Sequence, residues 1–283
     1  MARVVRKEAL GPEVFLLEVE APAIARKRKA GQFVILRLEP TGERFPLTIA
    51  DADPGRGTIT LVVQAVGKST MALAAREPGD EILDVLGPLG TPTHVEKFGH
   101  VVGVGGGVGA AVLHPIVAAM KEAGNRLTVI LGARSKDLLI LEDRMRRMAD
   151  RLLIATDDGS AGTHGFVTDV LKGLVDAGEA IDLVVAVGPV VMMRAVCRLT
   201  EPASIPTVVS LNPIMVDGTG MCGGCRVTVG GERKFACVDG PEFDGHEVDF
   251  EELMVRQSAY VAEERECRDE FCRLGGHKAG KGA

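Results

Sequence analysis

A chain of 283 residues is long enough for about two domains, each with its own hydrophobic core. Hydrophobic residues form 46% and charged residues 25% of the sequence, a balance typical of globular proteins. The net charge of −6, without a basic run of useful length, excludes nucleic acid as an expected partner.

Three features of the sequence bear on localisation. The first residues, Met-Ala-Arg-Val-Val-Arg-Lys-Glu, lack the apolar centre of a secretory signal. Residues 101–120 are almost wholly apolar, but five glycines between Gly103 and Gly109 indicate a strand and a turn instead of a membrane span. Six cysteines, three of them clustered, favour a reducing compartment over a disulfide framework. We therefore expect a soluble cytoplasmic protein with no membrane partner.

Residues 1–97 predict a small antiparallel β-barrel. Four short segments are rich in β-branched or other apolar residues, and Pro and Gly separate them. The expected strands cover residues 14–19, 33–38, 58–63 and 81–86. Short strands at this spacing are typical of a barrel, which we expect to form the first domain.

Two segments of this first domain suggest a ligand. Arg44-Phe-Pro-Leu-Thr48 follows a loop and leads into an apolar run. Gly67-Lys-Ser-Thr70 opens a helical stretch, where backbone N–H groups and hydroxyls could hold an anion such as a pyrophosphate. Neither segment is specific by itself, because Arg44 also suits a surface charge and residues 67–70 an ordinary helix N-cap.

Residues 98–212 predict a parallel sheet covered by helices, because strand and helix patterns alternate. The expected strands cover residues 100–104, 127–131, 152–155, 183–187 and 206–209. Together with the preceding region, this pattern predicts a β-barrel followed by an α/β nucleotide-binding domain.

The strongest nucleotide signal is Gly105-Gly-Gly-Val-Gly109, which ends the first of these strands before a helix expected over residues 110–123. Glycine lets the chain turn tightly and lets a phosphate approach the helix N-terminus. The spacing departs from the usual dinucleotide fingerprint, and the second strand ends in Gly132-Ala-Arg134-Ser135-Lys136 without an acidic residue. A nucleotide site is still expected, because Gly188-Pro189 marks a further turn at the carboxyl edge of the sheet.

Residues 213–248 hold the most informative motif, Asp217-Gly-Thr-Gly-Met-Cys222-Gly-Gly-Cys225, followed by Cys237. Thiolates bind iron or zinc strongly, and the two glycines between the first cysteines let the backbone wrap closely around a metal. The plant-type 2Fe–2S spacing is C-x4-C-x2-C…C, and Asp217 stands where the first cysteine is expected. We interpret this segment as a 2Fe–2S site with three thiolates and one carboxylate.

Two other interpretations of this segment stay open at this point. A zinc site would need a fourth soft or imidazole ligand, for which His246, Cys267 and Cys272 are candidates. Alternatively, three buried thiols surround a glycine-rich turn without any metal, and Asp217 belongs to an ordinary Asp-Gly turn. Residues 249–283 predict a charged helical tail that is solvated or packed against a partner.

Taken in order, these motifs resemble the ferredoxin–NADP reductase superfamily over nearly all of residues 1–260. The chain is similar to two groups within it: the electron-transfer subunit of dihydroorotate dehydrogenase, and the small subunit of NADH-dependent reduced ferredoxin:NADP oxidoreductase, also described as sulfide dehydrogenase. Two details favour the second group. Asp217 replaces a cluster cysteine, and Cys237-Val-Asp-Gly-Pro-Glu-Phe-Asp-Gly looks like the corresponding stretch of that group.

The resemblance implies FAD in the barrel, NAD(H) in the α/β domain and a 2Fe–2S cluster on the third segment. The residues expected at the flavin ring are Arg44, Pro46, Leu47 and Thr48, and those at its phosphates are Gly67, Ser69 and Thr70. The nicotinamide nucleotide site is expected to include Gly105, Gly106, Gly107, Gly109, Arg134, Asp157, Asp158 and Gly188. The cluster ligands are expected to be Asp217, Cys222, Cys225 and Cys237.

The choice between NAD(H) and NADP(H) depends on conflicting signals. Arg134, Ser135 and Lys136 could accommodate a 2′-phosphate, which favours NADP(H). The resemblance implies NAD(H) on this subunit, and we expect NAD(H).

The expected mechanism is electron transfer. NADH donates electrons in pairs and a 2Fe–2S cluster accepts them singly, so a flavin between the two sites explains why one chain carries both. Hydride transfer between nicotinamide C4 and flavin N5 needs positioning of the rings, and no histidine pair suggests a general acid or base. The cluster would pass electrons to a larger flavin- or iron–sulfur-containing subunit of a heterodimer, and to ferredoxin only indirectly.

Three rival functions remain from the sequence. The same flavoprotein could serve dihydroorotate oxidation. A non-enzymatic zinc-binding interaction module and a stand-alone oxidoreductase that uses a soluble ferredoxin are the other two.

Overall fold

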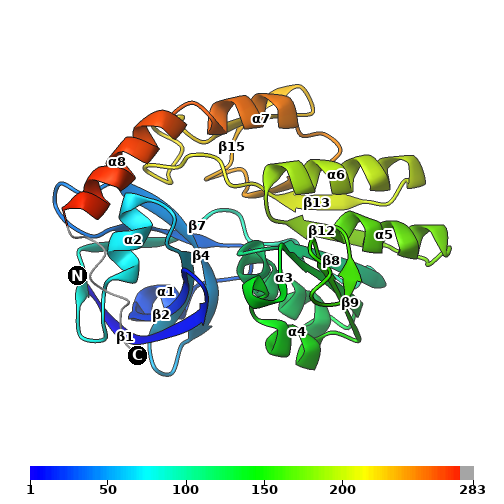
Figure 1. The fold of residues 1–283 in the computed structure, drawn as a ribbon, viewed down its shortest axis with the longest axis horizontal. Coiled ribbons are helices and arrows are strands. Elements are labelled where there is room, and N and C mark those ends of the chain that lie inside the picture. The colour runs from blue at the N-terminus through cyan, green and yellow to red at the C-terminus, as the bar shows by residue number, and fades with distance from the viewer. Residues whose placement is uncertain (275–283) are drawn as a thin grey trace.

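The computed structural model describes residues 1–274, in which two seven-stranded sheets lie side by side beneath a C-terminal segment (Figure 1). None of the helices formed by these residues is long and apolar enough to cross a membrane.

The first sheet is the predicted antiparallel barrel, with strand order β6-β1-β2-β5-β4-β3-β7. Its strands are β1 (Ala2–Gly11), β2 (Val14–Glu20), β3 (Phe33–Arg37), β4 (Arg44–Asp53), β5 (Thr58–Gln64), β6 (Glu81–Ile82) and β7 (Asp84–Leu89). Leu17 and Val19 of β2, like Leu61 and Val63 of β5, are two positions apart, so they share a sheet face and are fully buried in one core. Two short helices, α1 (Pro22–Ala25) and α2 (Lys68–Ala74), complete this domain.

The second sheet has the order β11-β10-β9-β8-β12-β13-β16. Its parallel strands are β8 (His100–Gly106), β9 (Arg126–Ala133), β10 (Arg151–Thr156), β11 (Thr163–His164), β12 (Leu183–Val187) and β13 (Thr207–Ser210). The α-helices are α3 (Gly109–Glu122), α4 (Glu142–Met148), α5 (Val167–Asp176) and α6 (Val190–Thr200), with 3-10 turns at Lys136–Leu138 and Glu201–Ala203. This arrangement confirms the predicted α/β domain.

Alternate residues of the central strands divide between two hydrophobic cores. Val101 of β8 and Val185 of β12 pack with Leu113 of α3, whereas Val102 and Val184 pack in the core that contains residues of α5 and α6. Successive strand residues point to opposite faces, so helices cover both faces of the sheet. The strands are therefore buried along their whole length, which explains their nearly continuous apolar sequences.

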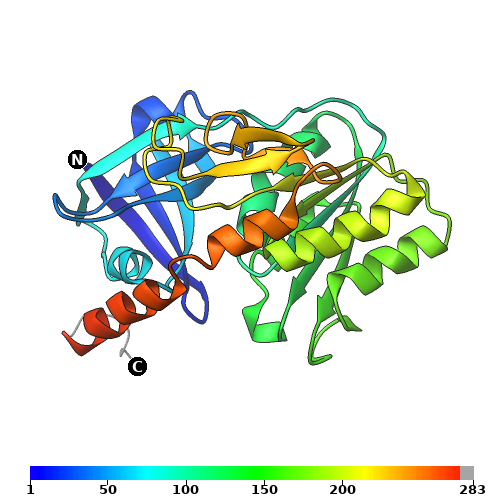
Figure 2. The same cartoon turned by 90° about the horizontal axis from the view of Figure 1, so that it is seen from above.

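The third segment lies over the junction of the two sheets (Figure 2). Strands β14 (Arg226–Val229) and β15 (Glu232–Phe235) form a separate hairpin, and β16 (Glu242–Asp244) pairs antiparallel with β13 at the edge of the second sheet. Helix α7 (Phe250–Gln257) follows, and α8 (Val261–Arg273) returns to the barrel, where it contacts α2 (Figure 1). The expected helical tail is thus two helices within the described residues.

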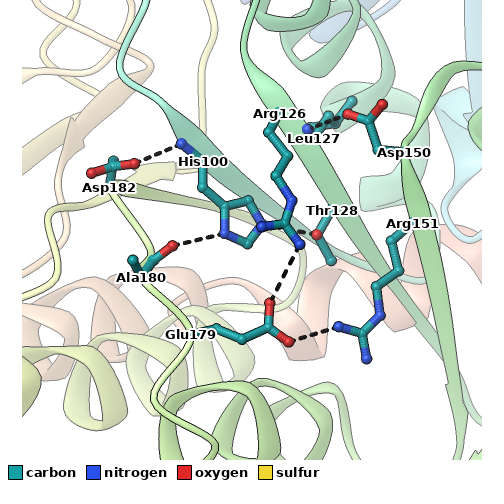
Figure 3. A network of polar contacts seen from close by, with 9 residues as sticks. All are labelled: His100, Arg126, Leu127, Thr128, Asp150, Arg151, Glu179, Ala180 and Asp182. Atoms are coloured by element: carbon teal, nitrogen blue, oxygen red, sulfur yellow. Dashed lines mark hydrogen bonds and ion pairs between the residues drawn. The ribbon is translucent and has the colours of Figure 1, made fainter.

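A buried polar network fixes the amino ends of the central strands (Figure 3). His100 is 5% exposed, and its ring nitrogens lie 2.8 Å from the Ala180 carbonyl oxygen and 2.9 Å from Thr128 Oγ1. Its backbone N–H donates to Asp182 Oδ2 at 2.6 Å. Both ring nitrogens and the amide therefore have partners, as buried polar groups require, and this histidine has a structural role at the sheet edge opposite the glycine-rich turn.

Candidate cofactor sites

A cavity of about 870 Å³ lies between the barrel and the α/β domain. Strand β4 supplies Pro46, Leu47 and Thr48 on the barrel side, and the turn after β8 supplies residues 106–109 on the other. Most of the other lining residues are apolar or glycine, and Arg134 and Asp157 are the only charged ones among the described residues. A cavity of this size and character suits flat aromatic rings with a few polar attachment points.

The topology of the sheet explains why the cavity forms at the glycine-rich turn. The chain leaves β8 for β9 and β10 on one side, and then crosses to β12 on the other side of β8. Gly105 is paired with Val187, so the carboxyl ends of β8 and β12 meet at this point. Ligands of open α/β sheets bind at such a switch point, because the two loops diverge there and leave a crevice.

Two glycines of the turn have clear physical requirements. Gly107 has φ +55°, and a Cβ on it would meet no atom within 4 Å, so its missing side chain leaves space at the cavity wall. A Cβ on Gly109 would lie 2.4 Å from the Val187 carbonyl oxygen and 2.8 Å from Gly188 Cα. Glycine at 109 therefore lets α3 begin directly against the end of β12.

The structure brings most of the predicted nucleotide and flavin residues together. The predicted residues that line the cavity are Pro46, Leu47, Thr48, Thr70, Gly106, Gly107, Gly109, Arg134, Asp157 and Gly188. The predicted residues that do not line it are Arg44, Gly67, Ser69, Gly105 and Asp158. Gly105 is buried beneath the turn, where a Cβ would come within 3.1 Å of Leu113, so its role there is packing. The ligand roles of all these residues stay predictions.

Only some of the barrel residues predicted at the flavin line the cavity. Thr70 Oγ1 accepts the Gly67 N–H and also lies 3.0 Å from the Gly67 carbonyl oxygen. The Ser69 hydroxyl donates to Glu43, and Arg44 is exposed at the start of β4. Thr70 therefore caps its own helix, while Arg44 lies outside the cavity lining.

The charged end of the cavity lies beyond β9 and β10. The Asp158 N–H donates to the Arg134 carbonyl, and the Lys136 N–H donates to Ser160 Oγ at 2.8 Å. The Ser160 hydroxyl and amide both donate to Asp158, which lowers the pKa of this carboxyl. The Asp158 carboxylate therefore binds Ser160 within its own loop. Of the two adjacent aspartates, only Asp157 lines the cavity.

The four predicted cluster ligands lie in one neighbourhood. Cys225 and Cys237 are each 1% exposed, whereas Cys222 is exposed. Burial raises the pKa of Cys237 to about 12, and the adjacent Cys225 thiol and the Asp217 charge act in the same direction. Asp217 accepts the N–H groups of Thr219 at 2.8 Å and Cys222 at 2.7 Å, and these backbone bonds lower its pKa. The Asp217 carboxylate is therefore held by the backbone of its own loop, next to Cys222.

The loop between Cys222 and Cys225 is held by two arginines that the sequence did not identify as functional. Arg226 Nη1 donates to the Gly223 carbonyl oxygen at 3.1 Å, and Arg256 Nη2 donates to the Gly224 carbonyl oxygen at 3.1 Å. Arg256 Nε is buried without an acceptor in the part of the chain that the structure describes. A buried donor on a side chain that holds the loop between Cys222 and Cys225 fits an anionic cluster, which supplies sulfur acceptors. Adjacency to Cys225 could have pointed to Arg226, but nothing in the sequence points to Arg256.

The cluster segment also forms one wall of the cavity. Met215 and Pro241, close in sequence to Asp217 and Cys237, are cavity-lining residues. A Cβ on Gly218 would lie 2.6 Å from the Leu89 side chain of the barrel, so the ligand loop packs directly on β7. Other lining residues that the sequence did not reveal are Gln64, Ser210 and Asn212.

Comparison with known proteins identifies the family. A model of the iron–sulfur cluster binding domain of dihydroorotate dehydrogenase B matches residues 212–249. A Thermotoga maritima protein described as a homolog of the dihydroorotate dehydrogenase B (NAD(+)) electron transfer subunit is 49% identical over 273 residues, which cover 96% of each chain. The chain belongs to the family of dihydroorotate dehydrogenase B electron transfer subunits.

Two further members support this assignment. The dihydroorotate dehydrogenase B (NAD(+)) electron transfer subunit of Desulforamulus reducens is 34% identical and covers 88% of this chain and 98% of its own. A chain from the structure of the NADH-dependent reduced ferredoxin-NADP oxidoreductase, solved in work on flavin-based electron bifurcation, is 48% identical with a TM-score of 0.91. It covers 96% of this chain and 98% of that one. The predicted fold, the family and its cofactors FAD, 2Fe–2S cluster and NAD(H) are confirmed.

Membership of this electron transfer subunit family favours iron over the zinc interpretation of the cysteines. His246 Nε2, a candidate zinc ligand, lies 2.9 Å from Thr200 Oγ1. Cys267 and Cys272 lie on α8, outside the matched domain. Among residues 1–274, no group of three His, Cys, Asp or Glu side chains is placed to hold a metal ion, so the assignment of iron rests on family membership.

Proposed function

We propose that this chain is the small electron-transfer subunit of an NADH-dependent reduced ferredoxin:NADP oxidoreductase. It moves electrons between NAD(H), FAD and a 2Fe–2S cluster, and from there to a larger flavin- and iron–sulfur-containing partner subunit. The observation that carries the proposal is that the cluster segment forms a wall of the nucleotide cavity, through Met215 and Pro241. The segment that carries the expected ligands Asp217 and Cys237 therefore adjoins the cavity at which electrons enter.

The similarity to the ferredoxin-NADP oxidoreductase chain, at a TM-score of 0.91, supports this function. Asp217 at the first ligand position supports it as well. The second candidate is the same subunit serving dihydroorotate oxidation, which the description of the Thermotoga relative favours. The larger subunit that copurifies from the native host distinguishes the two functions.

We assign a separate role to each of four parts of the chain. Residues 1–97 bind FAD, residues 98–212 bind the nicotinamide nucleotide, residues 213–248 bind the cluster and residues 249–283 form the tail. Strand β16 of the third part completes the sheet of the second, which couples the cluster segment to the nucleotide domain.

The residues of the chain act by binding and orienting. A bound flavin supplies the conversion from electron pairs to single electrons. Pro46 and Thr48 present one wall to the ring system, and Gly107 leaves room on the opposite wall. The N-terminus of α3 meets the cavity at Gly109, where the positive end of the helix dipole favours a phosphate. The mostly apolar lining suits ring systems, and the chain contributes to catalysis by positioning them.

The composition of the purified full-length chain tests the proposal. After anaerobic expression with iron supplied, we expect one flavin and two irons per chain, measured by absorption spectroscopy and metal analysis. NADH should bleach the flavin, and a larger subunit should copurify from the native host. A folded but colourless protein would contradict the proposal. We also propose a cytoplasmic location, because all six cysteines are free thiols and the ligands must stay reduced.

Asp157 is expected to select NADH over NADPH. Among the residues that the structure describes, it is the only acidic one that lines the cavity, where its carboxylate would repel a 2′-phosphate and accept a ribose hydroxyl. Asp157→Ser should raise kcat/KM for NADPH relative to NADH by about tenfold, because one charge near the phosphate is worth about 1.4 kcal/mol. Steady-state kinetics with both nucleotides measures the ratio. The control is Asp158→Ser, since Asp158 binds Ser160 outside the cavity lining, and an unchanged ratio in Asp157→Ser would refute the role.

Asp217→Cys is expected to change the cluster without removing it. A thiolate donates more electron density to iron than a carboxylate, so the reduction potential should fall by about 59 mV, a tenfold change in the one-electron equilibrium. Redox titration followed by EPR measures the potential. Asp239→Cys is the matched control, because the Asp239 carboxylate accepts the Phe235 N–H in a nearby turn. Identical potentials and spectra for Asp217→Cys and the unmodified chain would show that Asp217 is not a ligand.

A further inference from the structure

Arg256 reaches the cluster loop from outside the domain that defines the cluster site. It lies on α7, whereas the iron–sulfur domain recognised by comparison ends at residue 249. Its Nη2 donates to the Gly224 carbonyl oxygen at 3.1 Å, so it holds the backbone between Cys222 and Cys225. Arg226 holds the adjacent Gly223 carbonyl in the same way. Both glycine carbonyls of the loop therefore bind a guanidinium group.

The charge of Arg256 is unbalanced in the described residues. No carboxylate among them lies within 4.0 Å of its guanidinium group, whereas Arg194 and Arg198 both pair with Glu251 on the same helix as Arg256. Its Nε is in addition buried without an acceptor. The Gly224 carbonyl accepts from Nη2, but residues 1–274 supply neither an acceptor for the buried Nε–H nor a counter-charge for the guanidinium group.

A bound 2Fe–2S cluster meets both needs. Three thiolates and one carboxylate around the irons make the group anionic, and reduction adds one more negative charge. Sulfur atoms of the cluster and of its cysteines are hydrogen-bond acceptors, and hydrogen bonds to them are a main determinant of the reduction potential. A nearby cation stabilises the reduced state more than the oxidised state, because the attraction grows with the negative charge.

We propose that Arg256 is a positioning residue that orients the Cys222–Cys225 loop and raises the reduction potential of the cluster. The inference rests on the proposed function, since it requires the cluster. Arg256 lies on α7 at the start of the tail, and α8 continues from α7 to contact α2 of the barrel. A purely structural role for Arg256 would affect cluster retention but leave the potential unchanged.

The test is the midpoint potential of the cluster in the full-length holoprotein, measured by EPR-monitored redox titration. Arg256→Gln should shift the one-electron equilibrium toward the oxidised state at least tenfold, which corresponds to about 59 mV. Arg268→Gln is the matched control. It removes the same charge from the exposed face of α8, where Arg268 lies beside Asp269, and should leave the potential unchanged.

Arg256→Lys separates charge from hydrogen bonding and covers the case in which Arg256→Gln loses its iron. Lysine keeps the positive charge but lacks the Nε–H and the planar fork, so we expect an intermediate shift toward the oxidised state. If Arg256→Gln had the reduction potential of the unmodified protein, the inference would be overturned. If Arg256→Gln held no iron, an unchanged potential in Arg256→Lys would overturn it. Absence of a cluster signal in the unmodified protein would instead contradict the proposed function.

Discussion

Cys237→Ser is expected to remove the iron–sulfur cluster while leaving NADH-dependent flavin reduction intact. Cys237 is 1% exposed and adjoins Cys225, so it is enclosed among the ligands and no water or other thiol can take its place easily. A serine hydroxyl is a harder and far less acidic ligand than a thiol, so iron binding should weaken by more than tenfold. The cavity residues are untouched by this substitution, because Cys237 does not line the cavity.

Three measurements on the same preparation check that the cluster is lost while flavin reduction by NADH is kept. Iron content and the EPR signal of the dithionite-reduced protein should both fall to background, whereas stopped-flow bleaching of the flavin by NADH should keep its rate. Cys267→Ser is the control, because Cys267 lies on the half-buried face of α8, outside the matched iron–sulfur domain. If Cys267→Ser lost the metal while Cys237→Ser kept it, the ligand assignment would be wrong and the zinc interpretation would return.

Sequence analysis found the motifs whose functional residues lie close together along the chain, because local structure alone brings such residues together. Residues 105–109 combine a strand end, a tight turn and a helix start, and the structure places them at the switch point of the sheet. Cys222 and Cys225 are close in sequence, so their proximity in space needed no knowledge of the fold. The predicted strand over residues 183–187 matches β12 because a strand buried on both faces is a continuous apolar run.

The features that the sequence did not reveal depend on long-range contacts or on mixed patterns. Strand β1 carries Arg3, Arg6 and Lys7 among its apolar residues and buries only Val4 fully. Its sequence therefore lacks the regular pattern of apolar residues that predicts a strand. Strand β4 was not expected because a proline interrupts it, yet Pro46 pairs with Ile35 inside the sheet. Arg256 contacts Gly224 across 32 residues, a contact that only the packing of α7 creates.

Gly109→Ala is expected to destabilise the α/β domain and to weaken nucleotide binding. The added Cβ would lie 2.4 Å from the Val187 carbonyl oxygen and 2.8 Å from Gly188 Cα. Both neighbours are backbone atoms, so no side-chain rotation relieves the clash and either α3 or the end of β12 must shift. Overpacking of this kind costs about 3 kcal/mol, which should lower Tm by roughly 6–12 °C in a chain of this size.

Nucleotide binding should weaken together with stability, because Gly109 and Gly188 both line the cavity and a shift of the start of α3 or of the end of β12 moves the phosphate site. We expect the Kd for NADH to rise by about tenfold or more, since a small displacement of helix N–H groups misaligns several hydrogen bonds at once. Isothermal titration with NADH and thermal unfolding, both on the holoprotein, measure the two effects.

Gly173→Ala is the matched control for this substitution. Gly173 lies inside α5, where a Cβ would meet nothing within 4 Å, so alanine there should stabilise the helix by about 0.5–1 kcal/mol without affecting NADH binding. The opposite signs expected for the two glycine-to-alanine changes separate steric demand from helix propensity. If Gly109→Ala bound NADH normally and melted at the temperature of the unmodified protein, the close approach of α3 to β12 would not be what shapes the nucleotide site.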